Sequence, residues 1–243
     1  MEKIFAKDYP VGPGETDLFA MCRPSALLGF LQDAATIHAT LLGLSREDLI
    51  RRHGAVWILS RIRYELTRPL KFAETITVHT WPSTAKGALI RRDFDILADG
   101  RPAGEAFSAW VVLDLSARRP LRPGVVYNAF DGVPLEKCKN RELLKIHPEG
   151  SPQPAGDRTV RYSDLDINGH LNNVRYADVI CDALEFDKLS GRYISEMQIN
   201  FTAECRPGDI IALDRAHSGE KAFITGSCGG ARRFESEIFL EGC

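Results

Sequence analysis

Three polar side chains with catalytic chemistry alternate along one short segment of the sequence. Asp166, Asn168 and His170 are separated by one apolar residue and one glycine. On an extended backbone, alternate side chains share a face, so a carboxylate, an amide and an imidazole would meet one water or one carbonyl. The rival interpretation is a surface turn before a helix, with Asn172 as N-cap, because Asp-x-Asn-Gly is a common turn sequence. The spacing alone favours the turn.

Helical and strand-like patterns surround this segment and occur twice along the chain. In residues 24–43, apolar residues recur at steps of three and four, with Pro24 suited to a first turn and Gly43 to a stop, which predicts a buried helix. Strand-like runs follow at residues 56–66, 74–81, 88–97 and 106–115. A helical stretch then occupies residues 172–187, and further runs lie at 192–202, 209–217, 222–227 and 233–240. This order predicts an α+β fold built from duplicated units.

A segment rich in proline and glycine separates the two units. Residues 120–158 contain six prolines and four glycines, which is the composition of a linker or a long surface connection. We therefore predict a first domain at residues 1–122, a linker at 123–157 and a second domain at 158–243. The strands of the two halves align at an offset of 135, because Phe201 lies over Leu66 (201 − 66).

The polar triplet has no evident counterpart in the first half. Asp17-Leu18 can be laid over Asp164-Leu165 at an offset of 147 (164 − 17), and the residues 19–23 that follow then match none of the three polar positions. The sequence therefore predicts that the second half is specialised for chemistry.

The segment from Asp164 to Tyr176 resembles the acyl-acyl carrier protein thioesterases of plants and bacteria. The second half of that family carries the pattern D-L-D-x-N-x-H-x-N-N-V-x-Y, which this segment follows throughout. An adjacent pair, Glu204-Cys205, stands where the family has a Glu-Cys pair at the end of a strand. The resemblance implies a tandem (double) hotdog, in which each half wraps an antiparallel sheet around a long helix.

The resemblance also implies a catalytic set and an acyl-binding first half that lines a tunnel. The catalytic set consists of Asp166, Asn168, His170 and Glu204. Thioester hydrolysis needs an activated nucleophile, stabilisation of an oxyanion and a proton for the leaving thiolate. We expect Asp166 or Glu204, with His170, to activate a water, while Asn168 and a backbone N–H near Asn172 steady the carbonyl.

Cys205 offers a rival mechanism, because a Cys, His and Asn set could form a covalent acyl-enzyme. Adjacent residues of a strand point to opposite faces, so we expect only one of Glu204 and Cys205 to reach His170 unless the backbone bulges. We favour Glu204 as the functional member of the pair.

Bulk composition excludes several other classes of function. With 44% hydrophobic residues, 26% charged residues and a net charge of -2, the chain of 243 residues lacks the basic footprint of a nucleic-acid binder. No run reaches the roughly 18 apolar residues of a membrane span. The N-terminal residues show no export signal, so we expect a cytoplasmic enzyme. No glycine-rich nucleotide motif precedes a helix, so no cofactor is expected.

Other reactive or basic side chains receive structural interpretations. The six cysteines lack paired spacing, so we expect reduced thiols, no disulfide framework and no metal site. His38 and His53 have no second ligand at metal spacing, and each is expected to be satisfied or exposed. The tryptophans are interpreted as core aromatics, namely Trp57, Trp81 and Trp110. The most basic cluster is interpreted as a solvated face and, alternatively, as a docking surface for an acidic carrier protein; it comprises Arg118, Arg119, Arg122, Lys137 and Lys139.

The sequence thus predicts hydrolysis of fatty acyl-acyl carrier protein to free fatty acid and holo-carrier protein, without metal or cofactor. The partner would be the acylated carrier protein, and the chain would be a monomer or a homodimer. An acyl-CoA thioesterase on the same fold is one alternative, and a non-catalytic acyl-binding module is another. Acyl chain length would depend on how first-half side chains such as Leu31, Ile37 and Trp57 pack.

Overall fold

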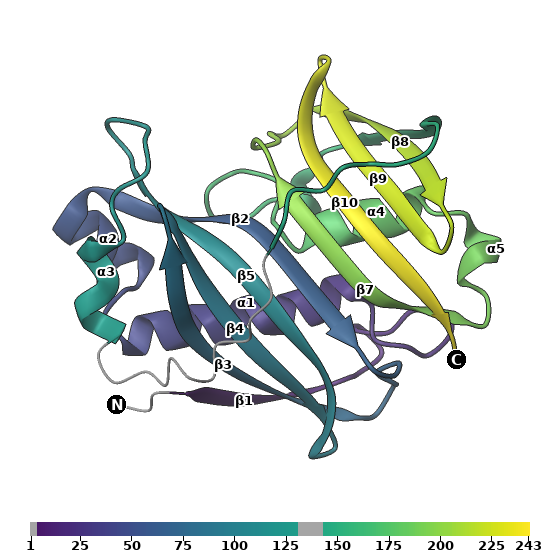
Figure 1. Cartoon of the computed structure of the whole chain (residues 1–243), viewed down its shortest axis with the longest axis horizontal. Helices are drawn as coiled ribbons and strands as arrows, with labels where there is room; N and C mark the ends of the chain where they lie inside the picture. The colour runs from purple at the N-terminus through teal and green to yellow at the C-terminus, as the bar shows by residue number, and fades with distance from the viewer. Residues whose placement is uncertain (1–3, 131–142) are drawn as a thin grey trace.

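The computed structural model describes residues 4–130 and 143–243, whose elements form two successive halves (Figure 1). The elements of the first half are β1 (Phe5–Pro10), α1 (Pro24–Leu41), α2 (Arg46–His53), β2 (Ala55–Leu66), β3 (Thr75–Lys86), β4 (Leu89–Ala98), β5 (Arg101–Asp114), α3 (Gly124–Tyr127) and η1 (Asn128–Phe130). Those of the second half are β6 (Gln153–Thr159), η3 (Tyr162–Asp164), α4 (Arg175–Ala183), α5 (Phe186–Leu189), β7 (Arg192–Phe201), β8 (Ile210–Ser218), β9 (Lys221–Cys228) and β10 (Ala231–Gly242).

Strands of both halves join in one antiparallel sheet, in the order β1-β3-β4-β5-β2-β7-β10-β9-β8-β6. Counted outward from the centre, the two halves have the same strand order. They meet where β2 pairs with β7, and there Arg63 lies opposite Gln198. These positions are 135 residues apart (198 − 63), the offset at which the two sets of strands align in the sequence. The halves are therefore related by a pseudo-twofold axis at the β2–β7 pair, which confirms the predicted duplication.

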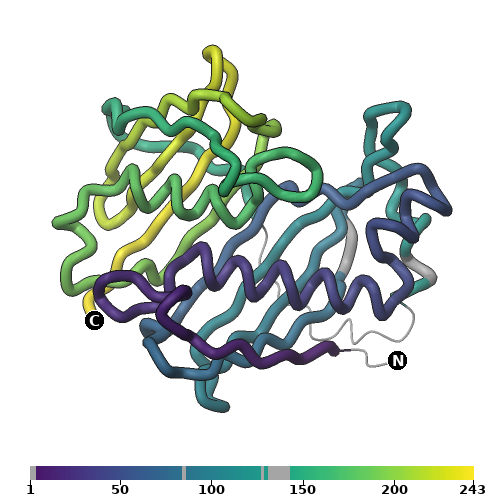
Figure 2. Tube along the Cα trace, turned by 180° about the vertical axis from the view of Figure 1, so that it is seen from behind, coloured from purple at the N-terminus to yellow at the C-terminus, as the bar shows by residue number. Residues whose placement is uncertain are grey.

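Each half packs a helix against its part of the sheet. Figure 2 shows α1 crossing the strands of the first half and α4 crossing those of the second. α1 begins with Pro24 in its first turn and buries a stripe that includes Leu27, Leu31 and Ala34. Fixed φ and a missing N–H make proline well suited to that first position. This arrangement confirms the predicted double hotdog, with one apolar core shared along the sheet.

Several elements differ from the sequence prediction. β1, α2 and β6 were not expected. α2 is a short polar helix that buries only Leu49; its N-cap Ser45 accepts the Asp48 N–H, and Gly54 ends it in the left-handed region. β6 begins within the segment 123–157 predicted as a linker and pairs with β8, so the second half starts before residue 158. Lys137 and Lys139 of the predicted basic cluster lie outside the described residues.

The second helix is shorter than the predicted stretch 172–187. Asn172 precedes it as a turn residue, because its Oδ1 accepts the Val174 N–H at 3.2 Å, and the helix begins only at Arg175. It ends where Leu184 adopts an extended backbone. Asn172 is therefore not the N-cap that the sequence suggested; Val174 occupies that position.

Candidate active site

Asp166, Asn168 and His170 lie in a tight turn rather than on an extended backbone. The Asp166 N–H donates to the His170 carbonyl at 2.9 Å, and the Gly169 N–H donates to the Asp166 carbonyl at 3.0 Å. Gly169 has a φ of 75°, a conformation that favours glycine. The prediction of an extended segment is therefore wrong, and the turn interpretation describes the backbone correctly.

The Asp166 carboxylate holds this turn together. Its Oδ1 accepts the N–H of Asn168 at 2.8 Å and the N–H of His170 at 3.2 Å. Its Oδ2 accepts the side-chain amide of Asn168 at 3.3 Å. The three predicted residues are thus brought together by the carboxylate itself, which fixes where the amide and the imidazole lie.

The same turn occurs in the first half of the chain. The Asp17 Oδ1 accepts the N–H groups of Phe19 and Met21 at 2.9 and 3.0 Å, and the Asp17 N–H donates to the Met21 carbonyl at 2.8 Å. Ala20 has a φ of 58°, like Gly169. Asp17 is therefore the counterpart of Asp166, at an offset of 149 (166 − 17), and the sequence alignment of Asp17 with Asp164 was wrong by two residues.

The corrected alignment shows which residues of the catalytic turn have equivalents in the first half. At an offset of 149, Phe19 replaces Asn168 and Met21 replaces His170; at the strand offset of 135, Pro69 replaces Glu204. The first half keeps the aspartate that forms the turn and lacks the other three groups. Because Asp17 makes the turn where no catalytic partner exists, the two backbone bonds of Asp166 are architectural.

Glu204 reaches the turn from the end of β7. Its Oε2 lies 3.1 Å from the Nε2 of His170, and both side chains are partly exposed, at 47% and 27%. The adjacent Cys205 carbonyl accepts the Leu171 N–H at 2.9 Å, which fixes the chain beside His170. The structure therefore brings Glu204 and His170 into direct contact, as the resemblance implied.

Cys205 faces the opposite way, into the core. The residue has no exposed surface, and its Sγ lies 4.0 Å from the Sγ of Cys228. Burial raises the pKa of the Cys205 thiol to about 11. A buried thiol is a poor nucleophile at neutral pH, since the thiolate is the reactive form. The predicted opposition of Glu204 and Cys205 holds, although both residues lie just beyond the strand.

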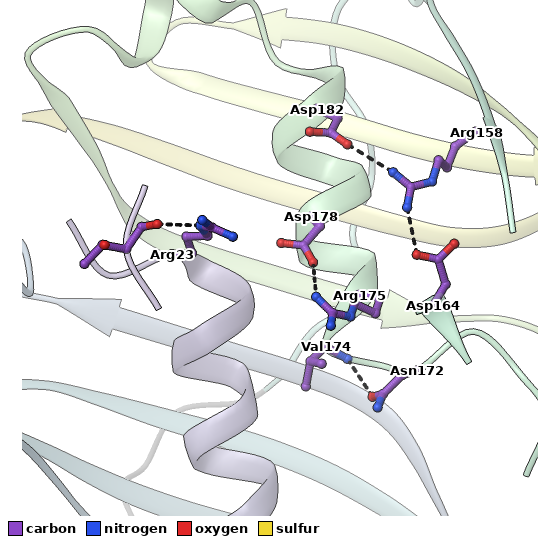
Figure 3. Close-up of polar contacts among 9 residues, drawn as sticks. Arg23, Arg158, Asp164, Asn172, Val174, Arg175, Asp178 and Asp182 are labelled. Atoms are coloured by element: carbon purple, nitrogen blue, oxygen red, sulfur yellow. Dashed lines mark hydrogen bonds and ion pairs between the residues drawn. The ribbon is translucent and has the colours of Figure 1, made fainter. Parts of the chain in front are cut away.

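Two anchors that the sequence analysis missed position the turn. Asp164, 4% exposed, accepts the Nη2 of Arg158 at 2.7 Å and the N–H of Arg161 at 2.8 Å. Figure 3 shows Arg158 between Asp164 and Asp182. The Asp164 carbonyl also accepts the Asn172 N–H at 2.8 Å. The first aspartate of the D-L-D sequence could have signalled this role.

The second missed anchor comes from the first half. Arg46, in α2, donates from Nε to the Oδ1 of Asn168 at 3.2 Å. Because Asp166 accepts from the other end of the same amide, the Asn168 side chain is held at both ends. No spacing in the sequence links Arg46 to a residue 122 positions later, so this contact follows from the fold alone.

A cavity of about 1080 Å³ opens beside these residues and extends into the first half. All four predicted catalytic residues line it, and so do side chains of α1, α2, β2, β4 and β5. Trp57 and Trp110 are partly buried against the apolar core, as predicted, but they also line the cavity, where they contact each other edge to face. Trp81, 1% exposed, is a core residue as predicted.

Other predicted features fall as follows. His38 is buried and bonded to Arg92, whereas His53 is exposed at the end of α2.

One group of possible metal ligands occurs within the described ranges. It consists of Cys205, Asp209 and Cys228, whose ligand atoms lie within 4.8 Å of one another. The nearby Cys228 thiol raises the pKa of Arg233, and the positive charge of Arg233 there opposes a bound cation. In the described part of the chain, no single helix is long and apolar enough to cross a membrane. The helices α1 and α2 reach the required length and composition only together, and the chain bends by 48° between them.

Comparison with known proteins identifies the family. The sequence matches the family model described as "Acyl-ACP thioesterase N-terminal domain" over residues 2–124 and that described as "Acyl-ACP thioesterase C-terminal domain" over residues 154–227. The chain belongs to the acyl-ACP thioesterase family. The first matched region contains β1 to β5, and the second contains nearly all of β6 to β9 but not β10, so the family's two domains account for most of the fold.

Individual relatives are distant in sequence. Palmitoyl-acyl carrier protein thioesterase of Cuphea hookeriana, a chloroplastic protein, is 23% identical over 234 residues, covering 89% of this chain and 56% of that protein. Dodecanoyl-[acyl-carrier-protein] hydrolase of Cinnamomum camphora, also chloroplastic, is 23% identical over 218 residues, covering 84% and 56%. The chain thus spans little more than half the length of these relatives.

Solved structures share the fold over their whole length. An acyl-ACP thioesterase from Bacteroides thetaiotaomicron has a TM-score of 0.85 at 24% identity, with 98% of each chain covered. The 12:0-ACP thioesterase from Umbellularia californica has a TM-score of 0.87 at 18% identity, covering 100% of this chain and 99% of the other. At such identities the likeness establishes the double hotdog architecture of the acyl-ACP thioesterase family.

Proposed function

We propose that this chain hydrolyses the thioester of a fatty acyl group carried by acyl carrier protein, releasing a free fatty acid and the holo-carrier. The observation that carries the proposal is the His170–Glu204 pair, 3.1 Å apart, at the wall of the 1080 Å³ cavity. An acyl chain needs a long enclosed space, and its thioester needs a base with a proton-transfer partner. Both lie at one place in this fold.

The reaction follows from the contacts of the turn. The Glu204–His170 pair accepts a proton from a water, whose oxygen attacks the carbonyl carbon of the thioester, and the proton passes between the two groups across their 3.1 Å contact. The tetrahedral intermediate then collapses, the C–S bond breaks, and His170 returns the proton to the leaving thiolate. Asp166, whose Oδ1 accepts two backbone N–H groups, positions His170 rather than taking the proton itself.

The oxyanion would be stabilised at the start of α4. The Asn172 N–H is already bonded to the Asp164 carbonyl. The next N–H, that of Asn173, has no hydrogen-bond partner within residues 4–130 and 143–243, and Asn173 lines the cavity. The N-terminus of a helix carries partial positive charge. We therefore move the role expected near Asn172 to the Asn173 N–H, which would act together with the side chain of Asn168 at the same cavity.

The charged and apolar side chains at the rim of the cavity are suited to binding an acidic carrier protein whose acyl group enters the cavity. The cavity-lining residues include three exposed arginines, namely Arg46 in α2, Arg118 in the loop after β5 and Arg206 in the loop after β7. Tyr162 and Ile167 are 93% and 84% exposed on the same rim. Positive charge around exposed apolar side chains is suited to docking an acidic partner. Arg118, part of the basic cluster found in the sequence, thus gains a role in carrier binding.

A comparison of carriers tests this proposal. Acyl carrier protein and CoA bearing the same acyl group present the same thioester, so kcat/KM for the two isolates the contribution of the carrier. We expect Arg206→Glu to raise KM for acyl carrier protein about tenfold and to leave hydrolysis of a short acyl thioester unchanged. Arg232→Glu, an exposed charge reversal away from the cavity, is the matched control. Equal losses with both thioesters would contradict docking at this rim.

We also propose a cytoplasmic location and a monomeric chain. Cys22, Cys181 and Cys243, like buried Cys205 and Cys228, are free thiols, which suits a reducing compartment. The β2–β7 pairing joins two hotdog halves within one chain, which removes the need for a second copy at that edge. Light scattering distinguishes the monomer from the homodimer, the second state expected from the sequence.

A further inference from the structure

A buried arginine interrupts the apolar wall of the cavity. Arg92, on β4, is 7% exposed and lines the cavity on the face of the sheet that α1 covers. Its neighbours on that face of β4 are the apolar residues Ile90 and Phe94, which are only 3% and 1% exposed. A guanidinium is rarely buried without a charged partner, since removal of a charge from water is costly. Its position therefore requires an explanation.

The guanidinium is only half satisfied by the protein. Both of its hydrogen bonds leave from Nη1, to the Oγ1 of Thr80 at 3.2 Å and to the Nδ1 of His38 at 3.1 Å. Since a guanidinium can only donate, His38 accepts with Nδ1 and brings no negative charge from that atom. No carboxylate of the described residues forms an ion pair with Arg92. Its Nε and Nη2 groups have no hydrogen-bond partner in that part of the chain.

Arg92 is charged at neutral pH despite this environment. Burial lowers its pKa to about 10, which still leaves the guanidinium protonated at pH 7. An unsubstituted hydrocarbon lying along the cavity would leave the free N–H donors without an acceptor. A second polar atom shares the wall, because Gln32 lines the cavity and its Oε1 is buried without a partner among the described residues. The wall thus offers both a donor and an acceptor.

We propose that Arg92 is a specificity residue for an oxygenated acyl chain, whose hydroxyl or carboxylate oxygen accepts from the free donors of its guanidinium. This inference rests on the proposed function, since the acyl chain enters from the His170–Glu204 end of the same cavity. A hydroxyl would accept a hydrogen bond from Arg92, whereas a carboxylate would add a direct ion pair with it. Either group supplies the acceptor that the protein does not provide.

The test compares acyl carrier proteins that bear unsubstituted, ω-hydroxy and ω-carboxy chains of equal length, from 8 to 16 carbons. For the wild-type protein we expect kcat/KM to favour an oxygenated chain by about tenfold to a hundredfold at the best length, as expected for hydrogen bonds to a charged group. Arg92→Met, similar in length but without donors, should remove this preference. Arg92→Lys should restore part of it. Arg61→Met, on β2 and away from the cavity, should leave it unchanged.

Two further measurements separate the possible failures. Turnover of unsubstituted chains by Arg92→Met shows that the variant is folded and that hydrolysis itself is intact. Calorimetric binding of free dodecanoic and dodecanedioic acids reports on the Arg92 subsite even if no thioester is hydrolysed. If the wild-type protein prefers unsubstituted chains at every length, and Arg92→Met changes neither the kcat/KM ratio nor the binding ratio, the proposal is wrong.

Discussion

Glu204 and Asp166 can be distinguished by paired substitutions that remove only a charge. Glu204→Gln takes the carboxylate away from His170, 3.1 Å distant, while keeping the side-chain shape. Because both side chains are partly exposed, the lost contact should cost about 0–1 kcal/mol of folding free energy. Removal of a general base typically lowers turnover about 10²- to 10⁴-fold. We therefore expect a large loss of kcat with a change in Tm of at most about 4 °C.

Asp166→Asn should behave in the opposite way. The asparagine oxygen can still accept the N–H groups of Asn168 and His170, but bonds to a neutral group are weaker by about 1 kcal/mol each. Two such bonds predict a loss of about 2 kcal/mol, or about 4–8 °C in Tm for a chain of this size. kcat should fall less than in Glu204→Gln, because the base remains.

Asp17→Asn is the matched control, since Asp17 makes the same two backbone bonds in the half that lacks the catalytic groups. It should lower Tm by a similar amount and leave kcat close to that of the wild-type protein. Thermal melting and release of fatty acid from acyl carrier protein are the two assays. A Glu204→Gln variant with normal kcat beside an inactive Asp166→Asn variant of unchanged Tm would make Asp166 the base and refute the assignment. Near-normal activity of Glu204→Ala beside an inactive Cys205→Ala would instead revive the covalent mechanism.

Three further predictions follow from contacts around the turn. Asp164→Asn should lower Tm by about 3–12 °C, because a buried carboxylate loses charge-assisted bonds worth about 1.5–3 kcal/mol; Arg175→Met, which removes only an exposed ion pair, should change Tm by less than about 2 °C. Gly169→Ala meets no atom within 4 Å, so its cost of about 1–2 kcal/mol would come from φ alone, and kcat should fall as His170 shifts; an unchanged kcat would show that the turn tolerates movement. Cys205 should resist iodoacetamide at pH 8, since a pKa of about 11 leaves about one thiol in a thousand ionised, and modification should rise about tenfold per pH unit; peptide mass spectrometry should find exposed Cys243 labelled first.

Regular patterns in the sequence were sufficient for most of the sheet. Strands with an alternating or continuous apolar pattern, such as β4 and β10, lie close to their predicted ranges. The edge strands β1 and β6 were not predicted. An edge strand pairs with only one neighbour, so its apolar and polar residues need not alternate strongly. The helix α2 was not predicted, because only one of its side chains is buried and its sequence therefore has no apolar stripe.

The four predicted catalytic residues lie together at one cavity, but their geometry was not predictable from the sequence. Glu204 and His170 are 34 positions apart (204 − 170), and their contact depends on the bond between Leu171 and Cys205, which no periodicity reports. The role of Arg46 depends on the packing of the first half against the catalytic turn. Trp57 and Trp110 pack against the core, but their second role as cavity walls was not predicted, because a strand pattern does not distinguish a filled interior from a cavity wall.

The duplicated turn explains how one fold divides its labour between two halves. Asp17 and Asp166 accept equivalent backbone hydrogen bonds, so the turn is a structural feature of each hotdog unit and does not depend on the catalytic groups. The proposed chemistry requires three additional groups, and the first half has Phe19, Met21 and Pro69 at their positions. The first half instead contributes α1 and β4 to the wall of the cavity, and Arg92 of β4 lines the part of the cavity that the acyl chain would occupy. Substitutions in the first half should therefore alter which chain is accepted, and substitutions at the second turn should alter how fast it is released.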